Sequence, residues 1–131
     1  MNPFNWPIRV YYEDTDAGGV VFYANYLKFF ERARTEMLRH LGFEQDQLIE
    51  IQKLIFVVRS VKVDYLKPAR FNDLINVDSA VIEKKKTSLI FKQSIFREDL
   101  LLCDAEIRIA CLDAHTMKPK PIPTEILEKI T

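Results

Sequence analysis

The sequence predicts an α+β fold in which a five-stranded antiparallel sheet wraps around one long helix. Two patterns predict it: apolar residues recur at helical spacing over residues 23–41, and several later segments alternate between apolar and polar residues. Strands that follow one another after a single helix favour an antiparallel sheet over a wound parallel sheet. The 131 residues contain no linker or shift in composition, so we expect one domain over residues 1–131.

The first strand is predicted at residues 8–12, and residues 14–19 form the turn that ends it. A long amphipathic helix follows from Tyr23. Its apolar positions are Tyr23, Tyr26, Leu27, Phe30, Met37, Leu38 and Leu41. Gly42 lies where a C′ glycine closes a helix, and residues 44–50 are expected to form a short second helical turn.

An extended region is expected from about Leu54 onwards. The remaining strands are predicted, from their two-residue period, at residues 61–65, 75–81, 89–95 and 105–111. Residues 67–70 separate the first two of these strands, and residues 97–99 form a hairpin turn between the last two.

Prolines at positions 119, 121 and 123 prevent further sheet pairing, and Thr124 is predicted to cap a short closing helix that reaches Ile130. One helix covers only one face of such a sheet, and a strand edge stays unpaired. We therefore expect the chain to associate with copies of itself.

The composition excludes several classes of protein. Hydrophobic residues make up 48% of the chain and charged residues 29%, which is typical of a globular protein with a true core. The 19 basic residues match the 19 acidic ones, so no overall field favours nucleic acid or an anionic membrane. Residues 1–7 resemble no signal peptide, and no apolar stretch is long enough to span a bilayer, so a cytoplasmic location is expected.

The two cysteines are expected to be core thiols. Cys103 and Cys111 lie on one predicted strand, which would place them roughly 26 Å apart at about 3.3 Å per residue. A disulfide between them is therefore excluded within one chain. The sequence has no Cys-x-x-Cys or Cys/His cluster, and no metal site is predicted.

The segment before the long helix carries the chemistry. Asp16 lies close to the helix N-terminus, and Gly18 and Gly19 allow a ligand to approach the backbone. The first N–H groups of a helix have no intrahelical partner and favour a developing oxyanion. A carboxylate beside a carbonyl polarised in this way could attack it or activate water. The alternative is that Asp14 and Asp16 only form Asx-turns or cap the helix.

Residues 12–26, Tyr-Glu-Asp-Thr-Asp-Ala-Gly-Gly-Val-Val-Phe-Tyr-Ala-Asn-Tyr, resemble the motif of hotdog proteins similar to 4-hydroxybenzoyl-coenzyme A thioesterase. With residues 31–38, Glu-Arg-Ala-Arg-Thr-Glu-Met-Leu, the chain resembles more narrowly the YbgC acyl-coenzyme A (acyl-CoA) thioesterases, bacterial proteins associated with the Tol-Pal cell-envelope system. Residues 56–59, 68–70 and 117–119 extend the resemblance over nearly the whole chain.

This resemblance implies the hotdog fold, a role in lipid metabolism and a reaction that needs no cofactor. It implies that Asp16 is the nucleophile or general base and that the backbone N–H of Tyr23 polarises the thioester carbonyl, with Gly18 and Gly19 shaping the approach. Acyl-CoA is the implied substrate, with acyl carrier protein as an alternative acyl donor. It further implies a homodimer or homotetramer with the substrate at a subunit interface, located in the cytoplasm or peripherally at the inner membrane.

Three further groups have two interpretations each. Arg34 falls within the apolar stripe of the helix and needs a carboxylate partner. Glu31, one turn away, is expected to pair with it, although some hotdog thioesterases use a helix glutamate for catalysis. A turn of cations and hydroxyls could bind the phosphates of coenzyme A or serve only solubility. It comprises Lys84, Lys85, Lys86, Thr87 and Ser88, with Arg59, Ser60 and Arg70 as weaker candidates.

Other classes of function fit the sequence less well. His40 and His115 lie in no general-base motif, and there is no Gly-x-Ser-x-Gly elbow of a serine hydrolase. The aromatic residues at the start of the helix could line an acyl tunnel or simply fill the core. A module that binds acyl-CoA or acyl carrier protein without catalysis stays the main alternative. Asp16 distinguishes the hydrolase from the binding module, because a binder needs no carboxylate beside the carbonyl.

Overall fold

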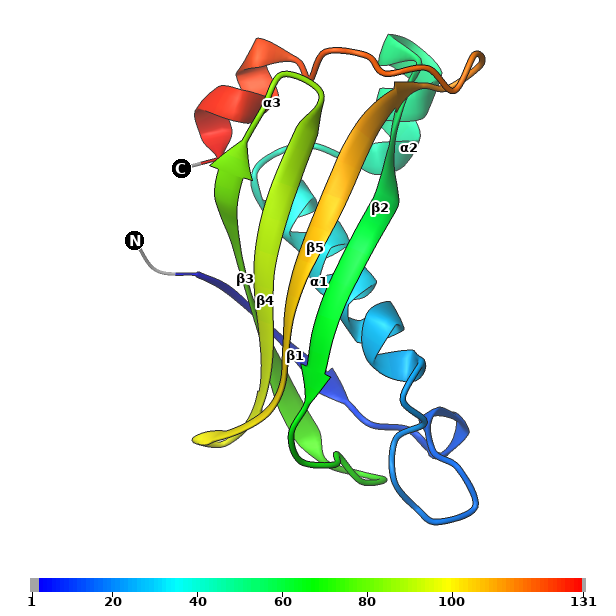
Figure 1. The fold of residues 1–131 in the computed structure, drawn as a ribbon, viewed down its shortest axis with the longest axis vertical. Coiled ribbons are helices and arrows are strands. Elements are labelled where there is room, and N and C mark those ends of the chain that lie inside the picture. Colours follow the sequence, from blue (N-terminus) through cyan, green and yellow to red (C-terminus); the bar gives the residue numbers. More distant parts are fainter. Residues whose placement is uncertain (1–2, 131) are drawn as a thin grey trace.

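Figure 1 shows five antiparallel strands that curve around one long helix in the computed structural model, which describes residues 3–130. The strands are β1 (Phe4–Arg9), β2 (Leu54–Tyr65), β3 (Leu74–Lys84), β4 (Ser88–Arg97) and β5 (Leu100–Asp113). Their order in the sheet is β1-β3-β4-β5-β2. The predicted α+β architecture is therefore confirmed. Residues 1, 2 and 131 of the predicted domain lie outside the described residues.

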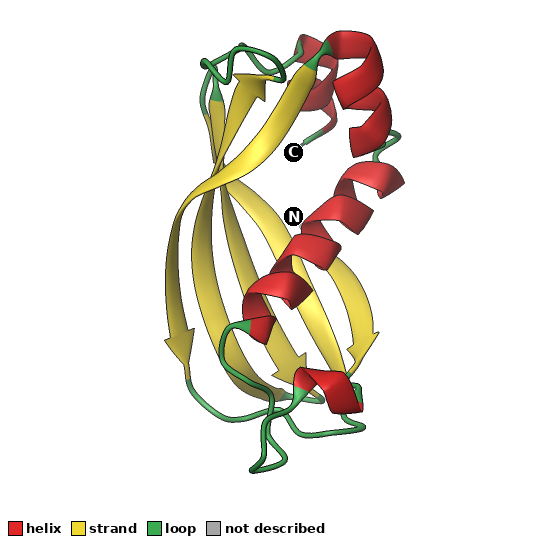
Figure 2. Ribbon diagram, turned by 90° about the vertical axis from the view of Figure 1, so that its right-hand side faces the viewer, coloured by secondary structure: helices red, strands yellow, loops and turns green. Residues whose placement is uncertain are grey.

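Helix α1 (Asn25–His40) packs against one side of the sheet, where the smaller helices α2 (Gln45–Gln47) and α3 (Thr124–Lys129) also lie (Figure 2). Its buried apolar residues are Tyr26, Phe29, Phe30, Ala33 and Leu38. They follow the 3.6-residue period, because only one stripe of a helix can face a sheet. Gly42 has a φ of +99°, which confirms it as the residue that ends the helix.

Strands β4 and β5 show the predicted two-residue alternation. Their inward side chains include Leu89, Phe91, Gln93, Ile95, Cys103, Ala105, Ile107, Ile109 and Cys111. Both cysteines are buried and unbridged, as expected. Burial raises the pKa of the Cys103 thiol to about 12 and raises that of Cys111 as well.

The prediction for the first strand was wrong at both ends. Strand β1 begins at Phe4 and ends at Arg9, while Tyr12 starts a 3-10 turn, η1 (Tyr12–Asp14), and is 78% exposed. The cause is local: the Tyr11 N–H donates to the Asp14 carboxylate at 2.8 Å. A side-chain acceptor that satisfies the backbone in this way competes with the sheet ladder.

Other predicted boundaries also needed correction. Strand β2 begins at Leu54, where the extended region was expected, and so is longer than the strand predicted at residues 61–65; a π-helical turn, η2 (Leu48–Gln52), precedes it. Thr124 is the first residue of α3 and not its cap, because Pro123 occupies the N-cap position. Tyr23 lies before α1 in a turn and is exposed.

The sheet has two edge strands of different character. Strand β1 is short and contains Pro7, which has no N–H to offer another strand. Strand β2 is twelve residues long and exposes the apolar side chains of Val58 and Val61. Of the two edges, β2 is therefore the one suited to pair with another chain. Within residues 3–130, no helix is long and apolar enough to cross a bilayer.

Candidate active site at the start of helix α1

Asp14 and Asp16, two residues apart, lie in opposite environments. Asp14 is only 7% exposed, and its carboxylate accepts the Tyr11 N–H. The Asp14 carbonyl accepts two more hydrogen bonds, from the Phe22 N–H at 3.0 Å and from the Asn25 side-chain amide at 2.9 Å. The Asp14 carboxylate therefore stabilises the turn η1, and the Asp14 carbonyl joins the loop to the start of the helix.

Asp16 lies exposed at the tip of a small hairpin. Its backbone N–H donates to the Val20 carbonyl at 2.9 Å, and its own carbonyl accepts the Gly19 N–H at 3.0 Å. The Oδ1 atom accepts the Gly18 N–H at 2.8 Å, so the Asx-turn considered from the sequence is present. Within the described part of the chain, Oδ2 accepts no hydrogen bond. The carboxylate of this exposed residue is thus oriented by one oxygen, while the other has no hydrogen-bond partner among the described residues.

The two glycines of the hairpin have separate functions in its geometry. A Cβ atom at Gly18 would lie 3.2 Å from the Asp16 Oδ1 atom and would press on the carboxylate. Gly19 has open space around it but a φ of +80°, a region that side chains rarely allow. Gly18 therefore permits the close Asx contact, and Gly19 permits the turn.

The first N–H groups at the helix start are available to a ligand. The Asn25 N–H donates to the Phe22 carbonyl at 2.8 Å, which closes the first turn. No acceptor among residues 3–130 binds the backbone N–H of Tyr23 or of Ala24. These donors stand at the positive end of the α1 dipole and are suited to an oxyanion.

An aromatic cluster links this helix start to the end of β2. The Tyr23 ring lies 4.8 Å from the Phe22 ring and 6.2 Å from the Tyr65 ring, measured between centroids. Tyr26, which is buried, accepts the Ala69 N–H at 2.9 Å through its hydroxyl. Burial raises the pKa of this hydroxyl, so it stays protonated at neutral pH. The site is thus fixed at the C-terminal end of β2.

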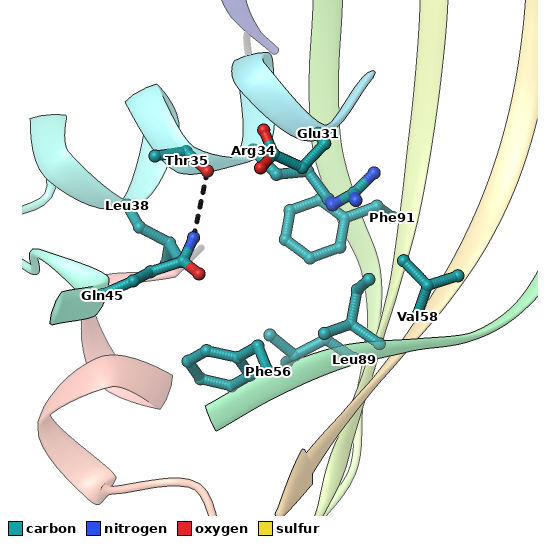
Figure 3. Close-up of a pocket in the computed structure, with 10 residues that line it drawn as sticks. Glu31, Arg34, Thr35, Leu38, Gln45, Phe56, Val58, Leu89 and Phe91 are labelled. Carbon is teal, nitrogen blue, oxygen red and sulfur yellow. Dashed lines mark hydrogen bonds between the residues drawn. The ribbon is translucent and has the colours of Figure 1, made fainter. Parts of the chain in front are cut away.

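A separate pocket opens between α1 and the sheet, near the N-terminal half of β2 (Figure 3). Its volume is about 130 Å³. Apolar side chains form one wall: Leu38, Phe56, Val58, Leu89, Phe91 and Ile109. Polar side chains form the other: Glu31, Arg34, Thr35 and Gln45.

Arg34 does not form the ion pair expected from the sequence. It is 8% exposed, and its guanidinium donates to the Gln93 Oε1 atom at 2.9 Å, while no carboxylate of the described residues lies within 4.0 Å of it. Gln93 in turn donates to the Phe30 carbonyl at 3.0 Å and to the Ser79 hydroxyl at 2.8 Å. Burial lowers the pKa of Arg34 to about 10, against a smaller opposite effect of Glu31.

The candidate coenzyme A residues lie far from Asp16 within one chain. Lys85 and Lys86 belong to the turn between β3 and β4, at the end of the molecule opposite to the start of α1 (Figure 1). Thr87 continues this turn, and its carbonyl accepts the Cys111 N–H at 2.8 Å. Ser88 begins β4.

Of the other candidate cations, Arg70 lies beside the Asp16 hairpin, because its backbone bridges to Val20, whose carbonyl accepts the Asp16 N–H, whereas Lys84 and Arg59 lie elsewhere. Lys84 donates to the Leu127 and Ile130 carbonyls and so holds the end of α3. Arg59 is exposed beside the β-bulge of β2. One chain therefore brings together Asp16, Gly18, Gly19 and Tyr23, with the weaker candidate Arg70 beside them, but not Arg59 or the turn at residues 84–88.

Sequence reasoning missed the roles of two amides. Asn25 joins the helix to the loop that carries Asp16, and a side-chain amide at the first helical turn is the signal that could have revealed it. Gln93 occupies an inward position of the alternating pattern in β4, between Phe91 and Ile95. A polar residue in the buried phase of a strand needs an internal partner, which was the available clue.

Comparisons with known proteins agree with the fold. The family model of the thioesterase-like superfamily matches residues 10–130. This superfamily is therefore the class of protein to which the chain with this hotdog fold belongs. The acyl-CoA thioesterase YbgC of Haemophilus influenzae is 50% identical over 125 residues, which cover 95% of this chain and 92% of that protein. The chain belongs to the YbgC family of acyl-CoA thioesterases.

Two solved structures show the same architecture. A hypothetical protein from Aquifex aeolicus superposes with a TM-score of 0.92 at 30% identity, over 98% of this chain and 100% of that one. A probable thioesterase from Bartonella henselae gives a TM-score of 0.88 at 34% identity, over 91% of this chain and 98% of that one. The hotdog fold expected from the sequence is therefore confirmed.

Proposed function

We propose that this acyl-CoA thioesterase uses Asp16 to cleave the bond between the acyl carbonyl and the coenzyme A sulfur, giving a carboxylic acid and a free thiol. The observation that carries the proposal is the position of one carboxylate oxygen. Asp16 is exposed, its Oδ1 atom is held by the Gly18 N–H, and its Oδ2 atom accepts no hydrogen bond from the described residues. A carboxylate oriented in this way needs little reorganisation before it acts on a carbonyl or a water.

In the proposed reaction, the carbonyl oxygen accepts a hydrogen bond from the Tyr23 N–H, which makes the carbonyl carbon more electrophilic. Asp16 then removes a proton from water, and the hydroxyl attacks that carbon. Alternatively, Asp16 attacks directly to form a mixed anhydride, which water hydrolyses. In both routes the C–S bond breaks, the thiolate leaves and takes a proton, and the acid is released.

A second copy completes the enzyme in this proposal. Two chains pair along their β2 strands, because β2 is the long edge without a proline and carries exposed apolar side chains. A dimer of dimers would bring Lys85, Lys86, Thr87, Ser88 and Arg59 of other chains towards the nucleotide of coenzyme A, since they cannot reach Asp16 within one chain. Cations and hydroxyls suit its phosphates.

The experiment is thiol release from short, long and aromatic acyl-CoA substrates, and from acyl carrier protein carrying the same acyl groups. It compares the unmodified chain with Asp16→Asn. Asp46→Asn is the matched control, because Asp46 is also exposed and also binds a nearby backbone N–H, that of Gln47 at 2.9 Å. We expect at least about a hundredfold loss of kcat/KM in Asp16→Asn and none in Asp46→Asn.

Two results would change the proposal. Unreduced turnover in a folded Asp16→Asn protein would show that another group does the chemistry. Tight binding of acyl-CoA by the unmodified protein without any thiol release would favour the alternative, a non-catalytic binding module. Single-turnover hydrolysis in ¹⁸O water tests for direct attack. Label in the Asp16 carboxylate shows a mixed anhydride that water opens at the Asp16 carbonyl, because the general-base route puts the label in the released acid alone.

A further inference from the structure

The pocket between α1 and the sheet does not serve the reaction centre of its own chain. Arg34 lies about 16 Å along the helix from Tyr23, at about 1.5 Å per residue. Phe29 and Phe30 are fully buried between these two points and close the direct path. The pocket instead opens beside Phe56 and Val58, near the N-terminal end of the free edge strand β2.

Pairing of two β2 strands would connect this pocket to the other chain's reaction centre. The start of α1 lies at the opposite end of β2, where Tyr23 packs on Tyr65. Antiparallel pairing of two identical strands places opposite ends side by side. The Tyr65 end of one copy, with its Asp16 and Tyr23, thus comes next to the Phe56 end of the other copy.

The polar wall of the pocket has a charge that forms no salt bridge with the described residues. Arg34 is more than nine-tenths buried, faces the pocket in Figure 3 and makes one side-chain hydrogen bond, to the neutral amide of Gln93. A guanidinium has five N–H donors in a fork that matches a carboxylate. Glu31 lines the same pocket but lies beyond ion-pair distance, so it does not satisfy this fork.

We propose that the pocket binds the distal end of a short acyl group that carries a terminal carboxylate, and that Arg34 binds this carboxylate. The substrate class is the coenzyme A thioester of a dicarboxylic acid. This inference rests on the proposed function, and it names the acyl group for the same site. Leu89 and Phe91 on the opposite wall contact the methylene groups of the acyl chain.

The size of the pocket sets the length of that acyl group. Its volume of about 130 Å³ is close to that of an engineered cavity of about 150 Å³ that accepts benzene. About six non-hydrogen atoms therefore fit beyond the thioester carbonyl. Glutaryl-CoA has three methylene groups and a carboxylate in this position. Longer straight chains would collide with the wall around Leu38.

The test compares glutaryl-CoA with 5-methylhexanoyl-CoA, which replaces the carboxylate by an isopropyl group of the same shape. We expect kcat/KM to be at least about tenfold higher for glutaryl-CoA, as befits a charge-assisted hydrogen bond. Free glutarate should likewise bind to the unmodified protein at least about tenfold more tightly than 5-methylhexanoate, as measured by calorimetry. Equal or reversed preference in the calorimetry overturns the inference, whatever the outcome of the kinetics.

Variants of Arg34 test whether this residue causes the preference for glutaryl-CoA over 5-methylhexanoyl-CoA. Arg34→Met should reduce the ratio of the two kcat/KM values to about one, whereas Arg34→Lys, which keeps the charge without the fork, should give an intermediate ratio. Asp16-dependent hydrolysis without any glutaryl preference would refute this inference and leave the proposed function intact. Glutarate binding without hydrolysis of any thioester would refute the proposed function and leave the carboxylate-binding pocket intact.

Discussion

The Asn25 side chain donates a hydrogen bond of 2.9 Å to the Asp14 carbonyl, and so the first residue of α1 is tied to the loop that carries Asp16. The same carbonyl accepts the Phe22 N–H at 3.0 Å. These two bonds hold the end of the hairpin against the helix start. They set where Asp16 lies relative to the free N–H of Tyr23.

Replacing Asn25 by alanine should therefore affect activity more than stability. We expect the free energy of unfolding to fall by about 1 kcal/mol, the typical net value of one hydrogen bond. We expect kcat to fall roughly tenfold, because small displacements of a catalytic group are costly. Asn5→Ala is the control, since it removes an exposed side-chain bond to Asp78 at the other edge of the sheet. Equal kcat in both variants would contradict the prediction.

Gly19→Ala and Gly42→Ala form a matched pair for backbone strain. Both glycines have a positive φ, +80° and +99°, and an added Cβ would meet nothing within 4 Å at either. Each substitution should cost about 1–2 kcal/mol of stability, as measured by urea denaturation. Only Gly19→Ala should lower kcat/KM, because only Gly19 shapes the Asp16 turn. A similar loss of activity in Gly42→Ala would show that the effect is global.

The buried network around Gln93 gives a prediction about stability. Gln93→Leu removes the only hydrogen-bond acceptor that the described chain gives to the Arg34 side chain, and we expect a loss of about 3 kcal/mol in the free energy of unfolding. Gln45→Leu, which removes a half-buried bond to Thr35, should cost less than about 1 kcal/mol.

The double variant Arg34→Met with Gln93→Leu tests this explanation. It should regain part of the loss seen in Gln93→Leu alone, because the unsatisfied buried charge is gone. A double variant less stable than either single variant would mean that packing, and not the charge, dominates.

Asp104 should make stability depend on pH in the acid range. Burial alone raises the pKa of this carboxyl, but hydrogen bonds from Lys92 at 2.7 Å and Ser94 at 2.8 Å outweigh it, and the pKa lies below its ordinary value. The stabilisation is thus present above the unfolded pKa and is lost as the pH falls through the folded pKa.

Asp104→Asn measures this contribution. It should destabilise the protein by about 1 kcal/mol at pH 7, a modest value because Lys92 is partly exposed. The difference from the unmodified protein should shrink below about pH 4, where the carboxyl of the unfolded chain takes up its proton. Urea denaturation at pH 7, 4 and 3 provides the comparison. A difference that does not change with pH would exclude the charge as its cause.

The sequence predicted the elements whose own pattern decides their structure. The helical stripe of α1 and the alternation in β4 and β5 each reflect burial on one face, and the structure shows them. The first strand failed because Asp14 satisfies the Tyr11 N–H locally, which an alternating pattern does not reveal.

At the candidate site, the local sequence pattern pointed to Asp16, Gly18 and Gly19, but not to the residues Asn25 and Gln93 that hold the surrounding structure in place. Helical spacing suggested Glu31 as the partner of Arg34, yet the actual partner is Gln93, 59 residues away in sequence. Such pairings follow from how α1 lies on the sheet, which no short segment encodes. The separation of the Lys85 turn from Asp16 likewise depends on the topology of β3 and β4.

The burial of both cysteines has a practical consequence. Thiol reagents act on the thiolate form, and the Cys103 and Cys111 side chains are shielded and hard to ionise. In the folded state the chain should therefore react with such reagents as if it had no cysteine. Coenzyme A released during turnover can be detected without a background from the enzyme. A single cysteine introduced on the surface, at Glu128 in α3 for example, can carry a spectroscopic label in the otherwise native sequence.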